Sequence, residues 1–261
     1  MNDGERAELK FIASLGSLCG KNVALATGSL NITSVQIPIA KGLQVILPYR
    51  IPITLANISS MTDPQLETFC KSNKISKAGT MSKADVFING IGYSIKFTSS
   101  APPAIVNHTN RTGWEFAAKQ KGVAMAPLDV LINDYWNKRI SGVIKEDVDN
   151  HHPHSPFANH MQTLLPFLEY FSFEGTGSRL SNHPASAVIE FSDPCNVGTW
   201  KLIAQPQFIS SIWSRLVFSL RSSKGMPNNI NSISASSRSS ILMWSRTQNE
   251  LLKGALHVRV K

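Results

Sequence analysis

Two opposite charges flank a short turn in the stretch KADVFINGIGYSIKF, residues 83–97. The carboxylate of Asp85 could hold a hard cation such as Mg²⁺, and Lys96 carries a positive charge that could act beside a reacting anion. The Asn-Gly pair between them favours a two-residue type I′ turn, because both central positions need positive φ. In that register Asp85 lies opposite Ser94, and Lys96 shares their face of the sheet at a diagonal distance of roughly 7 to 8 Å. The spacing therefore predicts a hairpin that brings carboxylate, hydroxyl and ammonium groups together.

Other loop lengths would change this arrangement. A four-residue loop would pair Asp85 with Lys96 directly, whereas a three-residue loop would separate the polar residues. On geometry alone, an exposed hairpin with a surface ion pair worth about 0 to 1 kcal/mol is the simpler interpretation. The opposite face carries a nearly unbroken apolar set that suits packing on a helix, namely Val86, Ile88, Tyr93 or Ile95, and Phe97.

Composition and charge limit the partners that the chain can have. With 261 residues, 42% of them hydrophobic, it can bury a sizeable core as one large domain or as two tightly fused halves. The net charge of +9 favours an anionic partner such as nucleic acid, a membrane surface or an acidic substrate. The excess is C-terminal: from residue 201 onward nine Lys or Arg face the single acid Glu250, and the first 200 residues hold 17 basic and 16 acidic residues.

The three cysteines indicate neither a disulfide framework nor a zinc site, because they are odd in number and no CxxC pair occurs. The first residues, MNDGERAELKF, are charged and lack the apolar region of a signal peptide, and no apolar run approaches the roughly 18 residues of a spanning helix. We therefore expect a cytoplasmic protein without a membrane segment.

The spacing of apolar residues predicts the elements that must position the charged groups. Glu8 falls on the apolar face of the first expected helix, which would direct its carboxylate toward the sheet. The expected elements are helices over 4–18, after 61 and over 155–171, short strands within 35–58 and over 187–191 and 200–203, and a Ser- and Asn-rich surface loop or arm over 228–240.

The hairpin and its flanks resemble a known enzyme family. An aspartate on one strand followed by x-x-Lys on the next is similar to the active-site hairpin of the PD-(D/E)XK nucleases, with Ala84 in place of the usual proline and Ser94 in place of the usual acid. The run GYSIKFTSSAPPAIVNHTNRTGW, residues 92–114, resembles type II restriction endonucleases of the HpaII-like group, in which serine replaces that acid. Further similarity lies in Asp3-Gly4-Glu5 with Glu8, in FLEYFSFEGTGSRLSNHPASAVIEFSDP, in RSSKGMP and in LLKGALHVRVK.

The resemblance implies a metal-dependent site. Asp85, the main-chain carbonyl of Ile95 and the helix carboxylate Glu8 would hold Mg²⁺, while Lys96 would orient and acidify the attacking water. Ser94 would occupy the place of the missing acid without supplying its charge. Glu8 or Glu5 could instead only stabilise the N-terminus of the helix electrostatically.

The resemblance and the basic composition also nominate residues for DNA contact, although a solvated loop or surface would explain them as well. Asn107, His108 and Arg111 follow the hairpin in a proline-containing loop, and one arginine of the basic region could read guanine through a bidentate contact. The DNA-binding candidates are Asn107, Arg111, Arg221, Lys224, Arg238 and Arg246.

These observations together lead to one prediction with two alternatives. We expect an α/β, restriction-endonuclease-like core with a central mixed β-sheet flanked by helices, in one domain over 1–261. Catalytic elements would occupy 1–125, and 126–261 would serve DNA recognition and dimerisation. The function would be Mg²⁺-dependent hydrolysis of both strands of a short DNA site by a prokaryotic homodimer, with a cognate DNA methyltransferase as functional partner. The alternatives are a nicking, repair or junction nuclease, and an inactive DNA-binding protein.

Overall fold

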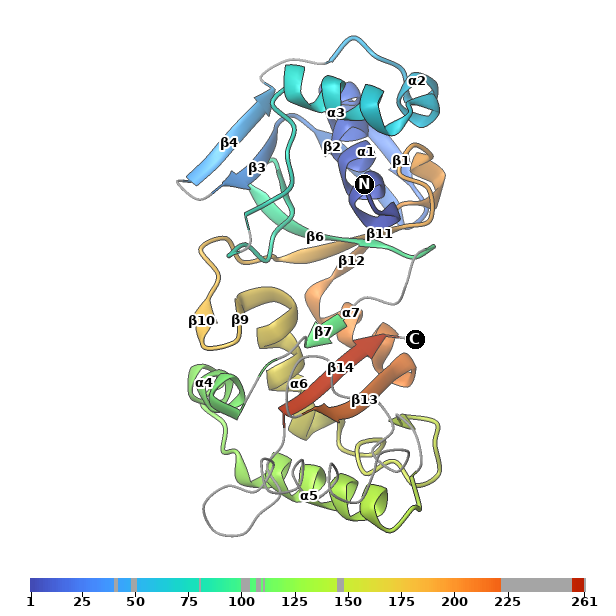
Figure 1. Ribbon diagram of the computed structural model, residues 1–261. Coiled ribbons are helices and arrows are strands. Elements are labelled where there is room, and N and C mark those ends of the chain that lie inside the picture. Colours follow the sequence, from blue (N-terminus) through green and yellow to red (C-terminus); the bar gives the residue numbers. More distant parts are fainter. Residues whose placement is uncertain are drawn as a thin grey trace. The chain divides into compact units, whose positions relative to one another are not determined.

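The computed structural model describes residues 1–39, 42–47, 51–79, 81–99, 104–106, 109, 111–144, 148–221 and 255–260. The chain forms two compact units that interleave along the sequence (Figure 1). Unit 1 comprises Met1–Ala101 and Ser181–Phe208, and unit 2 comprises Pro102–Leu180 and Ile209–Lys261.

A mixed sheet of six strands forms the centre of unit 1, in the order β12-β11-β6-β5-β3-β4. Strands β6 and β11 run parallel, and the other neighbours are antiparallel. A separate hairpin joins β1, Lys21–Leu25, and β2, Gly28–Ile32. The strands of the mixed sheet are β3 Val35–Ile39, β4 Gly42–Leu47, β5 Val86–Ile88, β6 Ile91–Phe97, β11 Ala187–Phe191 and β12 Lys201–Ala204.

The expected first helix is confirmed as α1, Asp3–Ser17. It begins with a capping box, in which the side chain of Asn2 accepts from the amide of Glu5 and the side chain of Glu5 accepts from the amide of Asn2. Two further helices belong to unit 1, α2 over Leu55–Ser60 and α3 over Asp63–Ser72. Helix α3 begins where the sequence predicted a short helix, with Pro64 in its first turn.

Aromatic packing holds α1 on the sheet. Phe11 stacks on Phe191 of β11 with ring centroids 4.6 Å apart and lies 4.5 Å from the ring centroid of Trp200. All three side chains are almost fully buried, and burying one such side chain contributes about 1.5 to 3 kcal/mol. Figure 1 shows α1 beside the sheet that contains β6 and β11.

The hairpin of β5 and β6 has the predicted two-residue turn. Asn89 and Gly90 both have positive φ, 53° and 81°, and Ile88 pairs with Ile91. The side chain of Asn89 also ties the turn to the preceding loop, because its Oδ1 accepts from the amides of Thr33 and Ser34 at 2.8 and 3.0 Å. The apolar face of the hairpin packs as expected, with Val86, Ile88 and Tyr93 in the core of unit 1.

Unit 2 contains an antiparallel sheet in the order β7-β14-β13-β8 and a small hairpin of β9 and β10. A π-helix over Tyr170–Glu174 extends α6, and the 3-10 turn Trp213–Arg215 follows α7, which crosses from unit 1 into unit 2. The elements are α4 Arg111–Lys121, α5 Ala126–Ile140, α6 Met161–Glu169, α7 Gln205–Ile212, β7 Ala104–Val106, β8 Val148–Asp149, β9 Gly175–Thr176, β10 Arg179–Leu180, β13 Leu216–Arg221 and β14 Ala255–Val260.

The α/β class with a mixed sheet flanked by helices is confirmed, and the local predictions succeed in part. Strand β11 matches the expected range, whereas α6 begins at Met161 because residues 155–160 form turns. The expected loop at Arg111 is wrong, because this residue begins α4. The predicted arm over 228–240 lies outside the described residues. None of the helices in the described part of the chain is long and apolar enough to cross a lipid bilayer.

Candidate active site

Main-chain groups fix the carboxylate of Asp85 at the edge of the hairpin. The β5 and β6 pairing ends at Val86 and Tyr93, and the amide of Asp85 donates to the carbonyl of Tyr93 at 2.8 Å. Asp85 Oδ2 then accepts from the amide of Ile95 at 2.6 Å and from Ser94 Oγ at 3.2 Å. The side chain of Asp85 therefore takes the place of a main-chain acceptor opposite β6.

A surface ion pair does not account for this aspartate. Across the described residues, Asp85 and Lys96 form no ion pair within 4 Å, and both residues are half-buried. A carboxylate has room for about four hydrogen bonds or ligands, and the two observed donors both use Oδ2. Oδ1 accepts no hydrogen bond within the described part of the chain and is therefore open to a ligand.

The carbonyl of Ile95 points to the same side of the strand as its amide. In an extended strand the amide and carbonyl of one residue point toward the same neighbouring strand. Because the amide of Ile95 donates to Asp85, its carbonyl also faces that side. The hairpin thus presents two oxygen donors, one from a side chain and one from the main chain, beside the residue that precedes Lys96.

Ser94 holds Asp85 rather than replacing the missing acid. Its side chain is 3% exposed, and its hydroxyl donates to Asp85 Oδ2. A serine hydroxyl contributes no negative charge, so a second charge at this site must come from another element. The neighbouring strand β11 places Val188 beside Ser94. Valine is uncharged, so the residue of β11 beside Ser94 does not supply the second charge.

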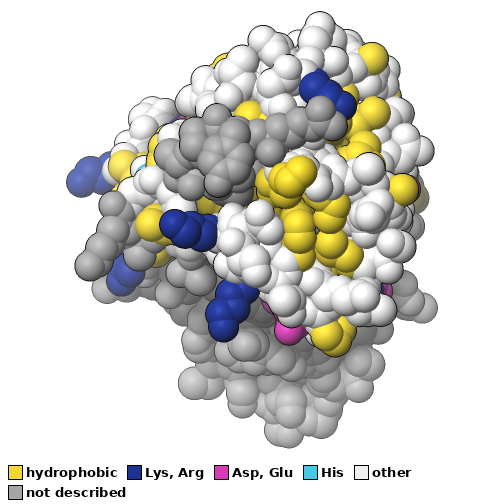
Figure 2. Space-filling model, turned by 90° about the horizontal axis from the view of Figure 1, so that it is seen from above, with side chains coloured by type: hydrophobic (Ala, Val, Ile, Leu, Met, Phe, Trp, Pro, Cys, Tyr) yellow, Lys and Arg dark blue, Asp and Glu magenta, His cyan; other side chains and the backbone are white. Residues whose placement is uncertain are grey.

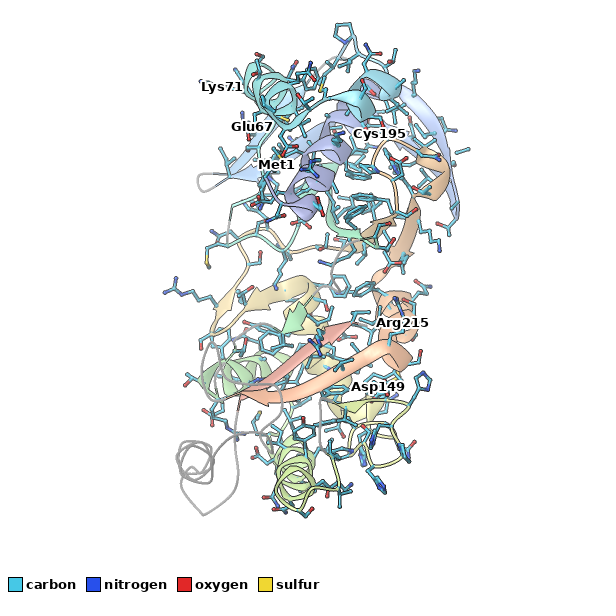
Figure 3. All side chains as sticks on the ribbon, turned by 45° about the vertical axis from the view of Figure 1, so that its right-hand side comes forward. Met1, Glu67, Lys71, Asp149, Cys195 and Arg215 are labelled. Atoms are coloured by element: carbon cyan, nitrogen blue, oxygen red, sulfur yellow. The ribbon has the colours of Figure 1, made fainter. Side chains whose placement is uncertain are left out.

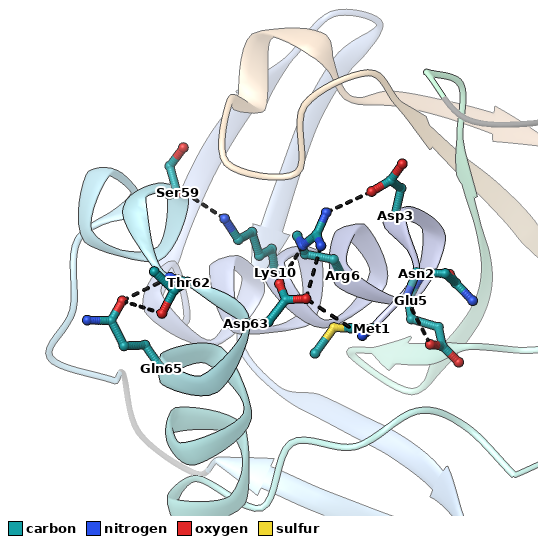
Figure 4. A network of polar contacts seen from close by, with 10 residues as sticks. All are labelled: Met1, Asn2, Asp3, Glu5, Arg6, Lys10, Ser59, Thr62, Asp63 and Gln65. Carbon is teal, nitrogen blue, oxygen red and sulfur yellow. Dashed lines mark hydrogen bonds and ion pairs between the residues drawn. The ribbon is translucent and has the colours of Figure 1, made fainter.

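The two glutamates of α1 differ sharply in their environments. Glu5 serves the capping box, and its Oε1 accepts from Lys77 Nζ at 3.0 Å (Figure 4 shows its place at the start of α1). The hydrogen bond from Lys77, followed by that from Asn2, lowers the pKa of Glu5. The sequence left open whether Glu5 or Glu8 stabilises the start of the helix, and in the structure Glu5 has this role.

Glu8 instead faces the hairpin. Burial, followed by the negative charge of Asp85, raises the pKa of Glu8 to about 7, and the positive charges of Lys77 and Lys96 act against this rise. A carboxyl group whose ionisation a neighbouring carboxylate makes more costly is typical of sites that bind a cation. In unit 1, Ser94 thus contacts Asp85, and the charges of Asp85 and Lys96 act on Glu8.

Two lysines near this site were not predicted from the sequence. Lys83 precedes Asp85 by two residues, and burial, followed by the charge of Lys96, lowers the pKa of Lys83 to about 8. Lys77 lies between α3 and β5. Its hydrogen bond to Glu5 raises the pKa of Lys77, and burial opposes this rise only in part. The only sequence signal for Lys83 was its alternation with Asp85 along an extended segment.

A third unpredicted neighbour is Glu190 of β11. The parallel register pairs Glu190 with Lys96 and Val188 with Ser94, so Glu190 lies on the Lys96 face of the sheet. The sequence signal for Glu190 was an acidic residue within the apolar stretch AVIEF. Its position beside Lys96 could not be predicted, because β11 and β6 are about 90 residues apart in the sequence.

The donor set suits Mg²⁺ better than a metal that needs a protein cage. Within the described ranges no group of three or more His, Cys, Asp or Glu side chains is arranged to hold a metal. Mg²⁺ is usually bound through one or two carboxylates and keeps several waters or substrate oxygens. Asp85 Oδ1, the carbonyl of Ile95 and Glu8 fit that requirement.

The two DNA-binding candidates that the structure describes, Arg111 and Arg221, belong to unit 2. Arg111 lies in unit 2, where its guanidinium pairs with Asp129 and with Glu115. Arg221 ends β13, and the remaining candidates Asn107, Lys224, Arg238 and Arg246, together with His108, lie outside the described residues.

Figure 2 shows one face of the described residues. On the face in Figure 2, apolar side chains gather in a patch, and Lys and Arg side chains lie singly. Figure 3 shows Glu67 and Lys71 on α3 and Arg215 in unit 2. Five of the nine basic residues after position 200 fall outside the described ranges: Lys224, Arg238, Arg246, Lys253 and Lys261.

Comparisons of the chain with protein-family models, with curated proteins and with solved structures found no match. The geometry of the hairpin and its neighbours is therefore the basis for any functional conclusion.

Proposed function

We propose that the protein is a Mg²⁺-dependent endonuclease with a restriction-endonuclease-like core, of the type II class, that hydrolyses both strands of a short duplex DNA site. The observation that carries this proposal is the fixed carboxylate of Asp85, which the amide of Ile95 orients beside Lys96. The mixed sheet flanked by helices is compatible with that core.

The residues of unit 1 match the needs of phosphodiester hydrolysis. Asp85, the carbonyl of Ile95 and Glu8 would hold Mg²⁺, which when bound supplies Lewis-acid stabilisation of the phosphoryl oxygens. Lys96 would orient the attacking water and stabilise the negative charge that develops on it. The water oxygen would form a bond to phosphorus while the bond to the 3′-oxygen breaks, leaving 5′-phosphate and 3′-hydroxyl ends.

Ser94 would act as a positioning residue. Its hydroxyl and the Ile95 amide restrict Asp85 to one orientation, and such neighbours typically change metal affinity or activity by about 10- to 100-fold when they are removed.

The remaining partners follow from charge and symmetry. The basic excess beyond residue 200 favours contact with DNA phosphates, and two coordinated cuts in a palindrome are most simply made by a homodimer. A cytoplasmic prokaryotic enzyme of this kind would need a cognate DNA methyltransferase to protect host DNA.

One observation favours an alternative. The acid expected before Lys96 is absent, and Ser94 is used to hold Asp85, so a DNA-binding protein without activity is the second candidate. A nicking, repair or junction nuclease would use the same residues as the proposed enzyme.

Incubation with plasmid and phage DNA separates these candidates. With Mg²⁺ we expect discrete bands that disappear in EDTA and with Asp85→Asn but persist with Glu67→Gln, a control on the exposed side of α3. Relaxed circles or smears would favour the nicking or repair nuclease. Intact DNA that shifts in a gel would refute the enzymatic proposal.

A further inference from the structure

A short hairpin of unit 2 presents one arginine to solvent. Strands β9 and β10 pair Thr176 with Arg179, so Gly177 and Ser178 form a two-residue turn (Figure 1). Gly177 has a positive φ of 57°, whereas Ser178 does not, and this combination is typical of a type II′ turn, which matches the twist of a hairpin. The residues from Ser178 to Leu180 are all exposed.

A buried tyrosine fixes the main chain of this hairpin. The hydroxyl of Tyr170 donates to the carbonyls of Arg179 and Gly177, at 2.9 and 3.2 Å. The side chain of Tyr170 is fully buried, and its ring packs edge-on against Phe171 with centroids 5.0 Å apart. Gly175 lies directly against the Tyr170 ring, because a Cβ at that position would overlap with it. The packed interior of unit 2 therefore holds the main chain of Arg179 in place.

The guanidinium of Arg179 has no protein partner. Within the described residues it forms no ion pair and no hydrogen bond, and only its main-chain carbonyl is engaged. The two acids that precede the hairpin, Glu169 and Glu174, both contact Lys121, at 3.1 and 2.8 Å. An arginine that is fixed at its main chain and unpaired at its guanidinium offers several N–H donors to an anion.

The hairpin continues in the sequence into a segment that contacts the chain before the active-site hairpin. Ser181 follows Arg179 by two residues, and its Oγ accepts from the amide of Lys83 at 2.9 Å. The carbonyl of His183 accepts from the same amide at 3.0 Å. Two residues thus separate Arg179 from a segment that is hydrogen-bonded to the chain leading into Asp85.

We propose that the hairpin over 175–180 is a DNA-backbone contact, in which the guanidinium of Arg179 binds a phosphate of the duplex. This inference rests on the proposed function and assigns to unit 2 a residue that recognises the substrate. An arginine matches two phosphate oxygens at once through parallel N–H donors. The turn residues Gly177 and Ser178 have no side chain or a short one, so a sugar-phosphate backbone can approach the main chain closely.

The composition of the hairpin favours a phosphate over the edge of a base. From Gly175 to Ser186 the only Asp, Glu, Lys or Arg is Arg179. Sequence is read by sets of side chains that reach base edges from a helix or ribbon in a groove, whereas single arginines, hydroxyl groups and main-chain amides are the usual phosphate contacts. The contact should therefore be independent of DNA sequence and should weaken with salt.

Fluorescence anisotropy of the whole protein with two labelled duplexes of unrelated sequence measures this contact, in EDTA so that neither duplex is cut. Arg179→Gln should weaken the binding of both duplexes by about tenfold, because charge-assisted hydrogen bonds are lost. It should also flatten the slope of log affinity against log salt by about one. Arg179→Lys should keep the wild-type slope, because the charge remains.

The matched control is Lys119→Gln, which removes one positive charge from an exposed position of α4 in the same unit and should leave affinity and slope unchanged. Wild-type affinity and an unchanged slope in Arg179→Gln would overturn the inference. A loss of binding limited to one of the two duplexes would also overturn it, because a phosphate contact does not distinguish sequences.

The hydroxyl of Tyr170 gives a second readout. Tyr170→Phe keeps the buried ring and removes the group that holds the carbonyls of Gly177 and Arg179. DNA binding should weaken by about threefold, because a looser hairpin must be ordered on the DNA. In the Arg179→Gln background the same change should have no further effect, since Tyr170 acts through Arg179. An equal loss in both backgrounds would contradict the positioning of Arg179 by Tyr170.

Failure of this inference is distinguishable from failure of the proposed function. Mg²⁺-dependent cleavage of plasmid DNA by the wild type tests the nuclease proposal alone. Binding and cleavage at the wild-type level by Arg179→Gln would refute the hairpin contact and leave the nuclease proposal standing. Binding that depends on Arg179, without cleavage by the wild type, would support the contact and refute the enzyme.

Discussion

Replacing Glu8 with glutamine should stabilise the protein at alkaline pH. The pKa of Glu8 is raised from its ordinary value of 4.5 to about 7, first by burial and then by the charge of Asp85. One pKa unit corresponds to about 1.36 kcal/mol, so the ionised side chain costs the folded state about 3 kcal/mol. Glutamine has nearly the same shape and no charge, and it avoids this cost.

The dependence on pH has a definite sign. Below pH 4.5 Glu8 is protonated in both the folded and the unfolded chain, so its ionisation costs nothing there. Between pH 4.5 and about 7 the folded state binds more protons at this residue than the unfolded state does, so the free energy of unfolding falls as pH rises. Above about pH 7 the full cost applies, and the advantage of Glu8→Gln reaches its maximum.

Urea unfolding of the wild type and of Glu8→Gln at pH 4.5, 6 and 8 measures this difference. We expect an advantage for the variant that is small at pH 4.5 and about 3 kcal/mol at pH 8. Glu5→Gln is the matched control on the same helix, and it should gain nothing at pH 8, because Lys77 and Asn2 lower the pKa of Glu5. Equal or lower stability of Glu8→Gln at pH 8 would mean that Glu8 does not face Asp85 from a buried position.

Three further predictions concern the hairpin and the basic region. Asn89→Ala should lower the free energy of unfolding by about 2 kcal/mol in urea melts, since it loses several hydrogen bonds and strains a positive φ; Asn89→Asp, which keeps the acceptor, should lose less. Gly92→Ala should cost about 1 to 3 kcal/mol, because a Cβ there would lie 2.7 Å from the carbonyl oxygen of Pro184, and an unchanged melting curve would contradict that close approach. Neutralising Arg221 and Lys224 together should flatten the slope of log affinity for DNA against log salt by about two, whereas an unchanged slope would place the DNA elsewhere.

Local signals in the sequence were sufficient for the hairpin and the first helix. The Asn-Gly pair demands positive φ at both positions, and this fixes the register that brings Asp85 to Ser94. The apolar spacing of 4–18 was likewise enough to predict α1 with Glu8 on its inner side. These features depend on neighbours a few residues apart, which a single sequence shows directly.

Contacts between distant segments were not accessible in this way. The pairing of β11 with β6 brings Glu190 beside Lys96, and the anchoring of Lys83 depends on Ser181 and His183. The preceding prolines led to the prediction that Arg111 lies in a loop, whereas it begins α4. No strong local signal in the sequence indicates this helix or the ion pair of Arg111 with Asp129. Such placements depend on tertiary packing, which overrides local propensity.

Single-turnover cleavage of duplex DNA at saturating Mg²⁺ tests the central assignment most directly, with Asp85→Ala and Lys96→Ala compared with Lys71→Gln. We expect the first two variants to lose at least about a hundredfold in rate while they bind DNA almost as the wild type does, because they lose a metal-holding oxygen and the group beside the attacking water. Lys71→Gln should cleave at the wild-type rate. Near-normal cleavage by either Asp85→Ala or Lys96→Ala would contradict the assignment of the hairpin as the active site.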